Sequence, residues 1–215
     1  MQTHHRQDAL SAQPQVFHYS LDWRFLLPIA DVSGVYVLFE GDADFSHTLE
    51  RVGISVSNQL SFSAFRQHKV GQIQSLALPF GPSLKHVGAD PDNESQFYSY
   101  CRSLIVPGGS FLVGFDNILK FQADPESKYY SSTPARVMQR LSRAGFQSNK
   151  IFGVLSNLRI PEYIFDLDSR TIHLALQNRF RRKPALLYAL RVLAGTIGTA
   201  RMSNFLPSYF AVATV

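Results

Sequence analysis

The sequence predicts an α/β domain built on a mainly parallel β-sheet. Near-continuous apolar runs, the form that buried parallel strands take, alternate with segments of helical periodicity. One complete β-α-β unit is visible within residues 35–59. Two apolar runs, 150–157 and 208–215, close the chain without a helix directly after the first. This ending indicates an antiparallel terminal strand.

Five elements are expected in the first part of the domain. Apolar residues at helical spacing mark two helices, and apolar runs mark three strands. In chain order they are a short helix within 17–31, a strand at 35–40, a helix at 44–52, a strand at 53–59 and a strand within 70–80.

The second part is predicted to contain two helices and three strands. A loop with at most a short strand at 84–87 precedes a helix at 94–106, for which Asp92 or Asn93 is the expected cap. "PGG" at 107–109 is expected to turn the chain into a strand at 110–117. Thr133 and Gly145 bracket the next helix as N-cap and stop signal. The two final strands enclose a long insertion, 158–207, that is at least partly helical.

Length and composition indicate the number of domains and exclude some classes of protein. The 215 residues form one domain, 17–215, preceded by a polar tail, 1–16, that we expect to be disordered. The tail lacks the apolar core of a signal peptide. The sequence has no stretch of eighteen uninterrupted apolar residues, so we expect no membrane-spanning helix. Cys101 is the single cysteine, which excludes an internal disulfide and a cysteine-rich metal site. We therefore expect a cytoplasmic protein, which could still be peripheral to a membrane, and no bound metal.

Three stretches carry a resemblance to a known family. "LIVPGGSFLVGFDN", "VMQRLSRAGF" and "KIFGVLSN" resemble the second half of class I S-adenosylmethionine (SAM)-dependent methyltransferases. In that family a helix ends in an "LxPGG" turn before a central strand, and a helix ending in "AGF" leads to the strands that close the sheet. "LALPF", 76–80, resembles the segment before the family's fourth strand. The resemblance covers 19–152 and the last ten residues, and it implies a Rossmann-like fold and SAM as cofactor.

The resemblance places the cofactor turn in "FEGDADF", directly after the first strand. Glu40, Gly41, Ala43 and Asp44 are then the implied cofactor-binding residues. The family's turn usually reads E/DxGxGxG, because the methionine part of the cofactor lies against bare backbone. Here Gly41 matches the first glycine, Ala43 adds a methyl group, and Asp44 or Phe45 replaces the third glycine. Side chains at these positions crowd the backbone, so we expect weak or absent SAM binding.

Two further positions depart from the family. The family commonly places a carboxylate after its second strand to bind both ribose hydroxyls, whereas this chain has the neutral amides Asn58 and Gln59. These amides are either weaker ribose ligands or ordinary strand-end residues. Only thirteen residues separate Phe80 from the helix at 94, where the resemblance implies a fourth strand and a substrate loop. His86 and Asp90 are the candidate proton-transfer groups there, or else surface loop residues.

Three weakened sites in one chain favour a methyltransferase-like protein with an eroded SAM site, acting as a non-catalytic binding or scaffolding subunit. Its partner would be an active methyltransferase or a second copy of the chain. The alternative is an active SAM-dependent methyltransferase for a small-molecule or lipid-linked substrate. A third hypothesis, an unrelated nucleotide-binding protein, is disfavoured because the sequence has neither a GxxxxGKS/T nor a full GxGxxG pattern.

Charge is distributed unevenly along the sequence. The net charge is +5, yet no acidic residue follows Asp168, while seven basic residues do. Four of them form a basic segment before a helix expected to begin near Pro184: Arg179, Arg181, Arg182 and Lys183. This segment is either the solvated entrance to a core-packed helix or a contact for anionic lipid or an acidic protein. Nucleic acid is disfavoured because few aromatic residues interleave the cations.

Overall fold

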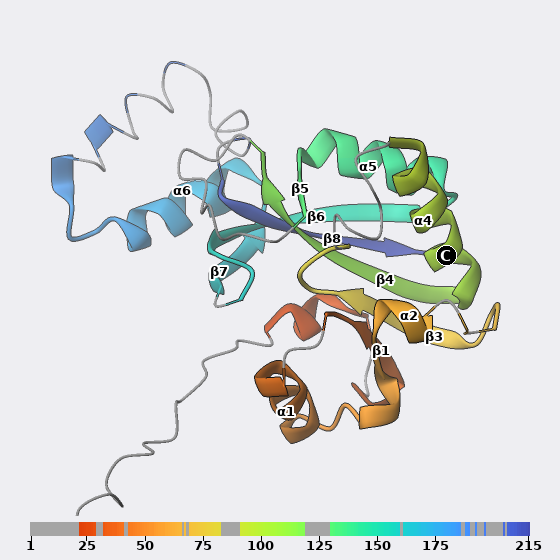
Figure 1. Cartoon of the computed structure of the whole chain (residues 1–215). Coiled ribbons are helices and arrows are strands. Elements are labelled where there is room, and N and C mark those ends of the chain that lie inside the picture. The colour runs from red at the N-terminus through yellow and green to blue at the C-terminus, as the bar shows by residue number, and fades with distance from the viewer. Residues whose placement is uncertain are drawn as a thin grey trace, which may run out of the picture.

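The computed structural model describes residues 22–28, 32–40, 43–65, 67, 69–82, 91–118, 130–159, 161–185, 188, 189, 192, 196, 204 and 206–215. Within these residues, helices cover an eight-stranded sheet with the order β2-β1-β3-β4-β8-β6-β7, and β5 pairs with β4 outside this path (Figure 1). The boundary between the expected tail and the domain lies outside the described residues, as does the short strand expected at 84–87.

The first part of the chain forms η1 (Asp22–Leu26), η2 (Val32–Gly34), β1 (Val35–Leu38), α1 (Ala43–Arg51), η3 (Val56–Asn58), β2 (Gln59–Leu60), α2 (Phe62–Phe65) and β3 (Ile73–Leu78). The second part forms α4 (Pro91–Leu104), β4 (Ile105–Asn117), β5 (Ser131–Ser132), α5 (Pro134–Arg143), β6 (Gln147–Ser156), β7 (Pro161–Asp166), α6 (Ser169–Arg179) and β8 (Ser208–Thr214).

The pairing of the strands confirms the predicted fold class. β1 pairs in parallel with β2 and β3, and β3 pairs in parallel with β4. β8 inserts antiparallel between β4 and β6, so the prediction of an antiparallel terminal strand is confirmed. β7 adds a further antiparallel strand at the edge, paired with β6.

Several predicted boundaries are wrong. The strand expected at 53–59 is reduced to the end of that segment, because Gly53 adopts a φ of 90° and the backbone then forms the 3-10 turn η3. α4 begins at Pro91, so Asp92 and Asn93 lie inside the helix and do not cap it. The insertion expected to be at least partly helical contains α6 but also the strand β7.

The "PGG" segment is part of β4 and does not turn the chain. The pairing register with β3 shifts between Ile73 and Ser75, opposite this segment. Gly108 has a φ of 77° and donates its N–H to the carbonyl oxygen of Val215 at 2.8 Å. A side chain at Gly109 would lie 2.5 Å from the carbonyl oxygen of Gln74. The glycines therefore form an irregularity within the strand, and the end of the chain pairs with it.

Helix α5 is capped as its sequence predicts. The Thr133 side chain accepts a hydrogen bond from the Arg136 N–H at 3.3 Å, and Pro134 occupies the first helical position. Gly145 follows the helix with a φ of 87°, the conformation that favours glycine. These local signals fix both ends of the helix.

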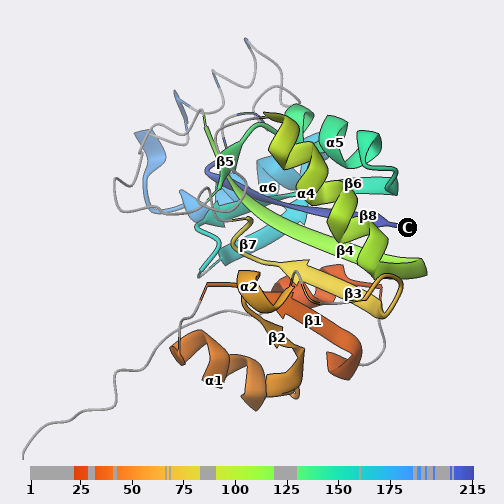
Figure 2. The ribbon, with the colours of Figure 1, turned by 45° about the vertical axis from the view of Figure 1, so that its right-hand side comes forward.

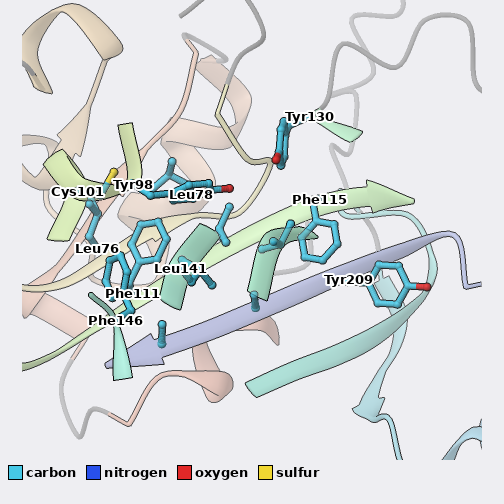
Figure 3. Packing of buried hydrophobic residues seen from close by; sticks show 14 of the residues in the cluster. Leu76, Leu78, Tyr98, Cys101, Phe111, Phe115, Tyr130, Leu141, Phe146 and Tyr209 are labelled. Atoms are coloured by element: carbon cyan, nitrogen blue, oxygen red, sulfur yellow. The ribbon is translucent and has the colours of Figure 1, made fainter. Parts of the chain in front are cut away.

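Apolar residues fill both faces of the sheet. On one face α4 lies over β4, and α5 lies beside it over β6 and β8 (Figure 2). There Tyr98, Phe111 and Phe146 pack ring against ring, with Phe111 and Phe146 stacked at 5.0 Å between centroids (Figure 3). Cys101 is fully buried in this cluster, and burial raises the pKa of its thiol, so the thiol is a core group. On the other face α1 and η1 contribute Trp23, Phe45 and Leu49.

Candidate functional site

The strand order locates the candidate site at the carboxyl ends of β1 and β3. From β1 the polypeptide runs to β2 on one side, whereas β3 and β4 lie on the other side. Open α/β sheets bind ligands outside the carboxyl ends of the strands, at this reversal of strand order. The segments after β1 and β3 therefore border the candidate site.

The same order corrects the expected position of the fourth strand. In the doubly wound order 3-2-1-4-5-6, strand 4 lies beside strand 1. β3 occupies that place, because Val35, Tyr36 and Val37 of β1 pair with Ser75, Leu76 and Ala77. "LALPF" thus belongs largely to the fourth strand itself, and no fourth strand is required after Phe80. Within the described residues, no strand lies outside β2, where the third strand of that order would pair.

An open cavity of about 410 Å³ lies between the beginning of α1 and β2. Its described lining comes from the end of β1, the first turns of α1 and the segment from η3 to the residue after β2: Phe39, Ala43, Ser46, Val56, Gln59, Leu60 and Ser61. The volume is within the range of small-molecule sites. The described lining offers apolar walls, hydroxyl groups and one amide, which suit a flat ring system with polar edges. It holds no carboxylate, imidazole or thiol for proton transfer.

The predicted cofactor residues lie in different positions around this cavity. Ala43 and Gln59 line it. Glu40 is exposed just after β1, and Asp44 is half-buried in the first turn of α1. Gly41 lies outside the described residues, as do His86 and Asp90.

The two amides expected to contact a ribose are both engaged within the protein. Asn58 is buried and donates its side-chain N–H to the Ser33 carbonyl oxygen at 2.6 Å, so it ties η3 to η2. The Gln59 amide nitrogen lies 3.4 Å from the Ser46 carbonyl oxygen, and the Ser46 hydroxyl donates to Gln59 Oε1. A ligand in the cavity would have to share or replace the Gln59 contacts.

Three phenylalanine rings meet where the strand order reverses. Phe39 follows β1, Phe80 follows β3, and the fully buried Phe45 comes from α1. The centroid of the Phe45 ring lies 5.0 Å from that of Phe39 and 4.8 Å from that of Phe80, both in edge-on contact. In a glycine-rich turn the third glycine permits close packing of helix and strand. Here the Phe45 ring occupies that interface.

The acidic residue described in the first turn of α1, Asp44, matches the helix dipole. Asp44 lies in the first turn, where a negative charge stabilises the helix by roughly 0.3 to 1 kcal/mol when exposed. The Thr48 hydroxyl donates to the Asp44 carbonyl oxygen at 2.8 Å. The turn is thus well suited to begin a helix, irrespective of any ligand.

Sequence reasoning missed a buried polar cluster on the α4–α5 face. Arg140 of α5 pairs with Glu94 of α4 and donates to the Tyr130 hydroxyl at 2.7 Å, and that hydroxyl donates to Glu94. Desolvation raises the pKa of Glu94 in spite of the neighbouring Arg140. A Cβ atom at Gly81 would lie 2.9 Å from the Tyr130 Cβ. Tyr130 therefore packs closely against the turn after β3. No short-range pattern in the sequence connects these three residues.

The basic segment follows the end of α6. Arg179 lies in the last turn of this helix, where a cation is favourable, and its Nε lies 2.9 Å from Glu162 Oε2. Arg179, which the sequence places before a helix expected to begin near Pro184, is thus the last residue of α6. Arg181, Arg182 and Lys183 follow as exposed residues, and Pro184 and Ala185 are helical.

The described part of the molecule contains neither a candidate metal site nor a candidate membrane-spanning helix. No group of three potential metal-ligating side chains is found there. No helix in that part has the length and apolar character needed to cross a bilayer.

Comparison with known proteins adds the fold family. No protein-family model matches the sequence, and neither does any curated protein. Among solved structures, the chain is similar to a SAM-dependent methyltransferase from Archaeoglobus fulgidus, with a TM-score of 0.50 and 15% identity over 84% of this chain and 85% of the other. It is also similar to a SAM-dependent methyltransferase from Thermotoga maritima, with a TM-score of 0.51 and 12% identity over 89% of this chain and 84% of the other.

These likenesses establish the class at the level of the fold. The protein has the Rossmann-like fold of class I SAM-dependent methyltransferases, with β8 as the antiparallel strand between β4 and β6. It is a methyltransferase-like protein in this structural sense.

Proposed function

We propose that this protein is a methyltransferase-like protein whose SAM site has eroded and that it acts as a non-catalytic binding or scaffolding subunit. The observation that carries the proposal is the buried Phe45 ring between Phe39 and Phe80, where strand order reverses. In a glycine-rich cofactor turn, a glycine near this position lets the helix pack closely on the strand, so the Phe45 ring indicates that the turn lacks that close packing.

The ribose side of the site supports the same proposal. A carboxylate that accepts hydrogen bonds from both ribose hydroxyls makes charge-assisted contacts, which are about twice as strong as neutral ones. This protein offers Gln59, whose amide already contacts Ser46. Asn58 donates to Ser33 and does not line the cavity. The methionine side and the ribose side of the site are therefore weakened independently.

The alternative is an active SAM-dependent methyltransferase for a small-molecule or lipid-linked substrate. The cavity of about 410 Å³ favours it, because this cavity lies at the carboxyl ends of β1 and β2 and is lined by Ala43 and Gln59. Methyl transfer from SAM would then depend mainly on how the two substrates are held together.

Calorimetric titration with SAM and S-adenosylhomocysteine separates the two proposals. We expect weak or undetectable binding by the folded protein. A dissociation constant in the low micromolar range, about −8 kcal/mol, would support the active enzyme and overturn the eroded site.

If binding is observed, two variants locate it. Ala43→Leu fills the cavity at an exposed position of α1 and retains a strong helix-forming residue, whereas Ala64→Leu makes the same change on α2 outside the described lining. A SAM site in the cavity is lost in the first variant and kept in the second. Gly41→Val should also abolish binding if the predicted cofactor turn is correct.

The scaffolding proposal also requires a partner, either an active methyltransferase or a second copy of the protein. Native mass spectrometry of the purified protein tests the second copy directly. A monomer at every concentration would leave a different protein as the partner.

A further inference from the structure

Three exposed cations stand together after α6. Arg181, Arg182 and Lys183 are exposed, and a backbone hydrogen bond of 2.8 Å from the Lys183 N–H to the Phe180 carbonyl oxygen holds their turn. Within the described residues the ion pair of this segment is that of Arg179 with Glu162. No acidic residue follows Asp168 in the sequence, so the residues after this turn supply no counter-charge.

Exposed apolar side chains follow the cations at helical spacing. Residues 184, 185, 188, 189, 192 and 196 are helical, and each of them is exposed. Tyr188 is 72% exposed and Val192 is 50% exposed, one turn apart. Ala185 lies three residues before Tyr188, and Ala189 lies three residues before Val192.

The position in the fold separates this surface from the candidate SAM site. α6, which precedes this surface, lies beside β7 (Figure 1), and β7 and β2 form opposite edges of the sheet. A flat partner could meet this edge without covering the cavity.

We propose that a surface formed by Arg181, Arg182, Lys183, Tyr188 and Val192 binds anionic lipid bilayers, with the cations among the headgroups and the side chains of Tyr188 and Val192 in the interface. A basic cluster next to exposed tyrosine and aliphatic side chains has the chemistry of an in-plane interfacial helix. Tyrosine is also favoured at the boundary between headgroups and acyl chains, because its ring is apolar and its hydroxyl is polar.

The apolar residues favour a bilayer over other anionic partners. An acidic protein or a nucleic acid would account for the cations, but neither requires the exposed side chains of Tyr188 and Val192 that follow them. A bilayer accounts for both features, because headgroup charge attracts the cations and the interface removes the apolar side chains from water. Because apolar burial adds to electrostatic attraction, three cations are enough for membrane binding in this proposal.

Vesicle sedimentation tests the proposal. The full-length protein is mixed with vesicles of phosphatidylcholine alone or with about a third of phosphatidylserine, at low and at high salt. We expect binding to the anionic vesicles and a marked loss at high salt, where screening is strongest. The variant Arg181→Gln/Arg182→Gln/Lys183→Gln should bind the anionic vesicles about a hundredfold more weakly, since each cation near such a surface contributes about fivefold.

A matched variant controls for net charge. Arg51→Gln/Lys69→Gln/Arg143→Gln removes three exposed cations from other parts of the molecule, so its net charge equals that of the first variant. It should bind the vesicles like the wild type. The melting temperature of the first variant should stay level or rise slightly, because exposed like charges repel one another. Equal losses in both variants would reduce the effect to net charge and overturn the proposal.

A second pair of substitutions tests the apolar component. Tyr188→Ser/Val192→Ser keeps every charge, and both side chains are largely exposed, so the fold should persist. We expect this variant to bind the anionic vesicles at least tenfold more weakly at all salt concentrations. Unchanged vesicle binding would overturn the interfacial contact. Absence of wild-type binding to vesicles, with binding to heparin or to polyglutamate, would assign the cations to a polyanionic macromolecule and overturn the proposal as well.

Discussion

Removal of the Arg140 guanidinium tests the buried polar cluster most directly. Arg140 and Glu94 are 9% and 6% exposed, and they join α5 to α4 with Tyr130 between them. The substitution Arg140→Leu keeps a helix-forming residue with an apolar side chain, but it leaves the Glu94 carboxylate without its main counter-charge. Breaking a buried ion pair on one side costs about 3 to 5 kcal/mol, because the remaining charge is desolvated and uncompensated.

For a domain of this size, that loss corresponds to a decrease in melting temperature of roughly 6 to 20 °C. The decrease should depend on pH. Burial already raises the pKa of Glu94 above its ordinary value near 4.5, and Arg140 is the largest influence that lowers it. Without Arg140 the pKa in the folded state rises further. The stability contributed by a carboxyl group with a raised pKa is fully present below its unfolded pKa and is lost as pH rises through the folded value.

The assay is thermal and urea unfolding followed by circular dichroism at about pH 4 and about pH 7.5. We expect a large deficit for Arg140→Leu at the higher pH and a smaller one at the lower pH. Arg143→Leu makes the same change at an exposed position of α5 and should cost less than about 0.5 kcal/mol. The double variant Glu94→Met/Arg140→Leu should recover most of the loss, because no charge stays buried. If Arg140→Leu and Arg143→Leu unfold at the same temperature, the cluster does not form as described.

Three further predictions concern stability, and urea unfolding measures each of them. Phe45→Ala should cost about 3 to 5 kcal/mol, since it empties the space between the rings after β1 and β3; a loss below about 1 kcal/mol would show that the ring is not core. Gly114→Ala should destabilise the protein severely, because the new methyl group would overlap the backbone carbonyl of Pro79, whereas Gly34→Ala meets nothing within 4 Å and should be mild. Thr133→Ala should cost about 1 kcal/mol through loss of the N-cap of α5, and Thr133→Ser should restore most of it.

The sequence locates much of the candidate site, but it does not show which side chains meet there. The stretch "FEGDADF" is correctly expected to join β1 to α1, and the series of apolar runs correctly predicts which elements precede and follow it. The sequence also shows that Phe45 stands near the position of a third glycine. It does not show that the ring meets Phe39 and Phe80, because Phe80 is distant in the sequence and reaches the site only through the pairing of β3 with β1.

The errors have a common physical origin. The segment 53–59 has the composition of a strand, yet Gly53 and the Asn58–Ser33 hydrogen bond shape most of it into a turn. "PGG" has the composition of a turn, yet pairing with the last residues of the protein keeps it in β4. In both segments a contact with a distant part of the sequence overrides the local preference.

The sequence by itself determined the α/β class, the capped helix α5, the buried runs of β1, β3, β6 and β8, and the clustering of cations after Asp168. These features depend on the alternation of apolar and polar residues and on the chemistry of single caps, which act over a few residues. Only the tertiary structure decided that β3 lies beside β1, that Glu94, Tyr130 and Arg140 share one buried cluster, and that Phe45 fills the space where strand order reverses. Each of these depends on which distant segments pack together to bury apolar surface, and the periodicity of a single segment does not encode its partner.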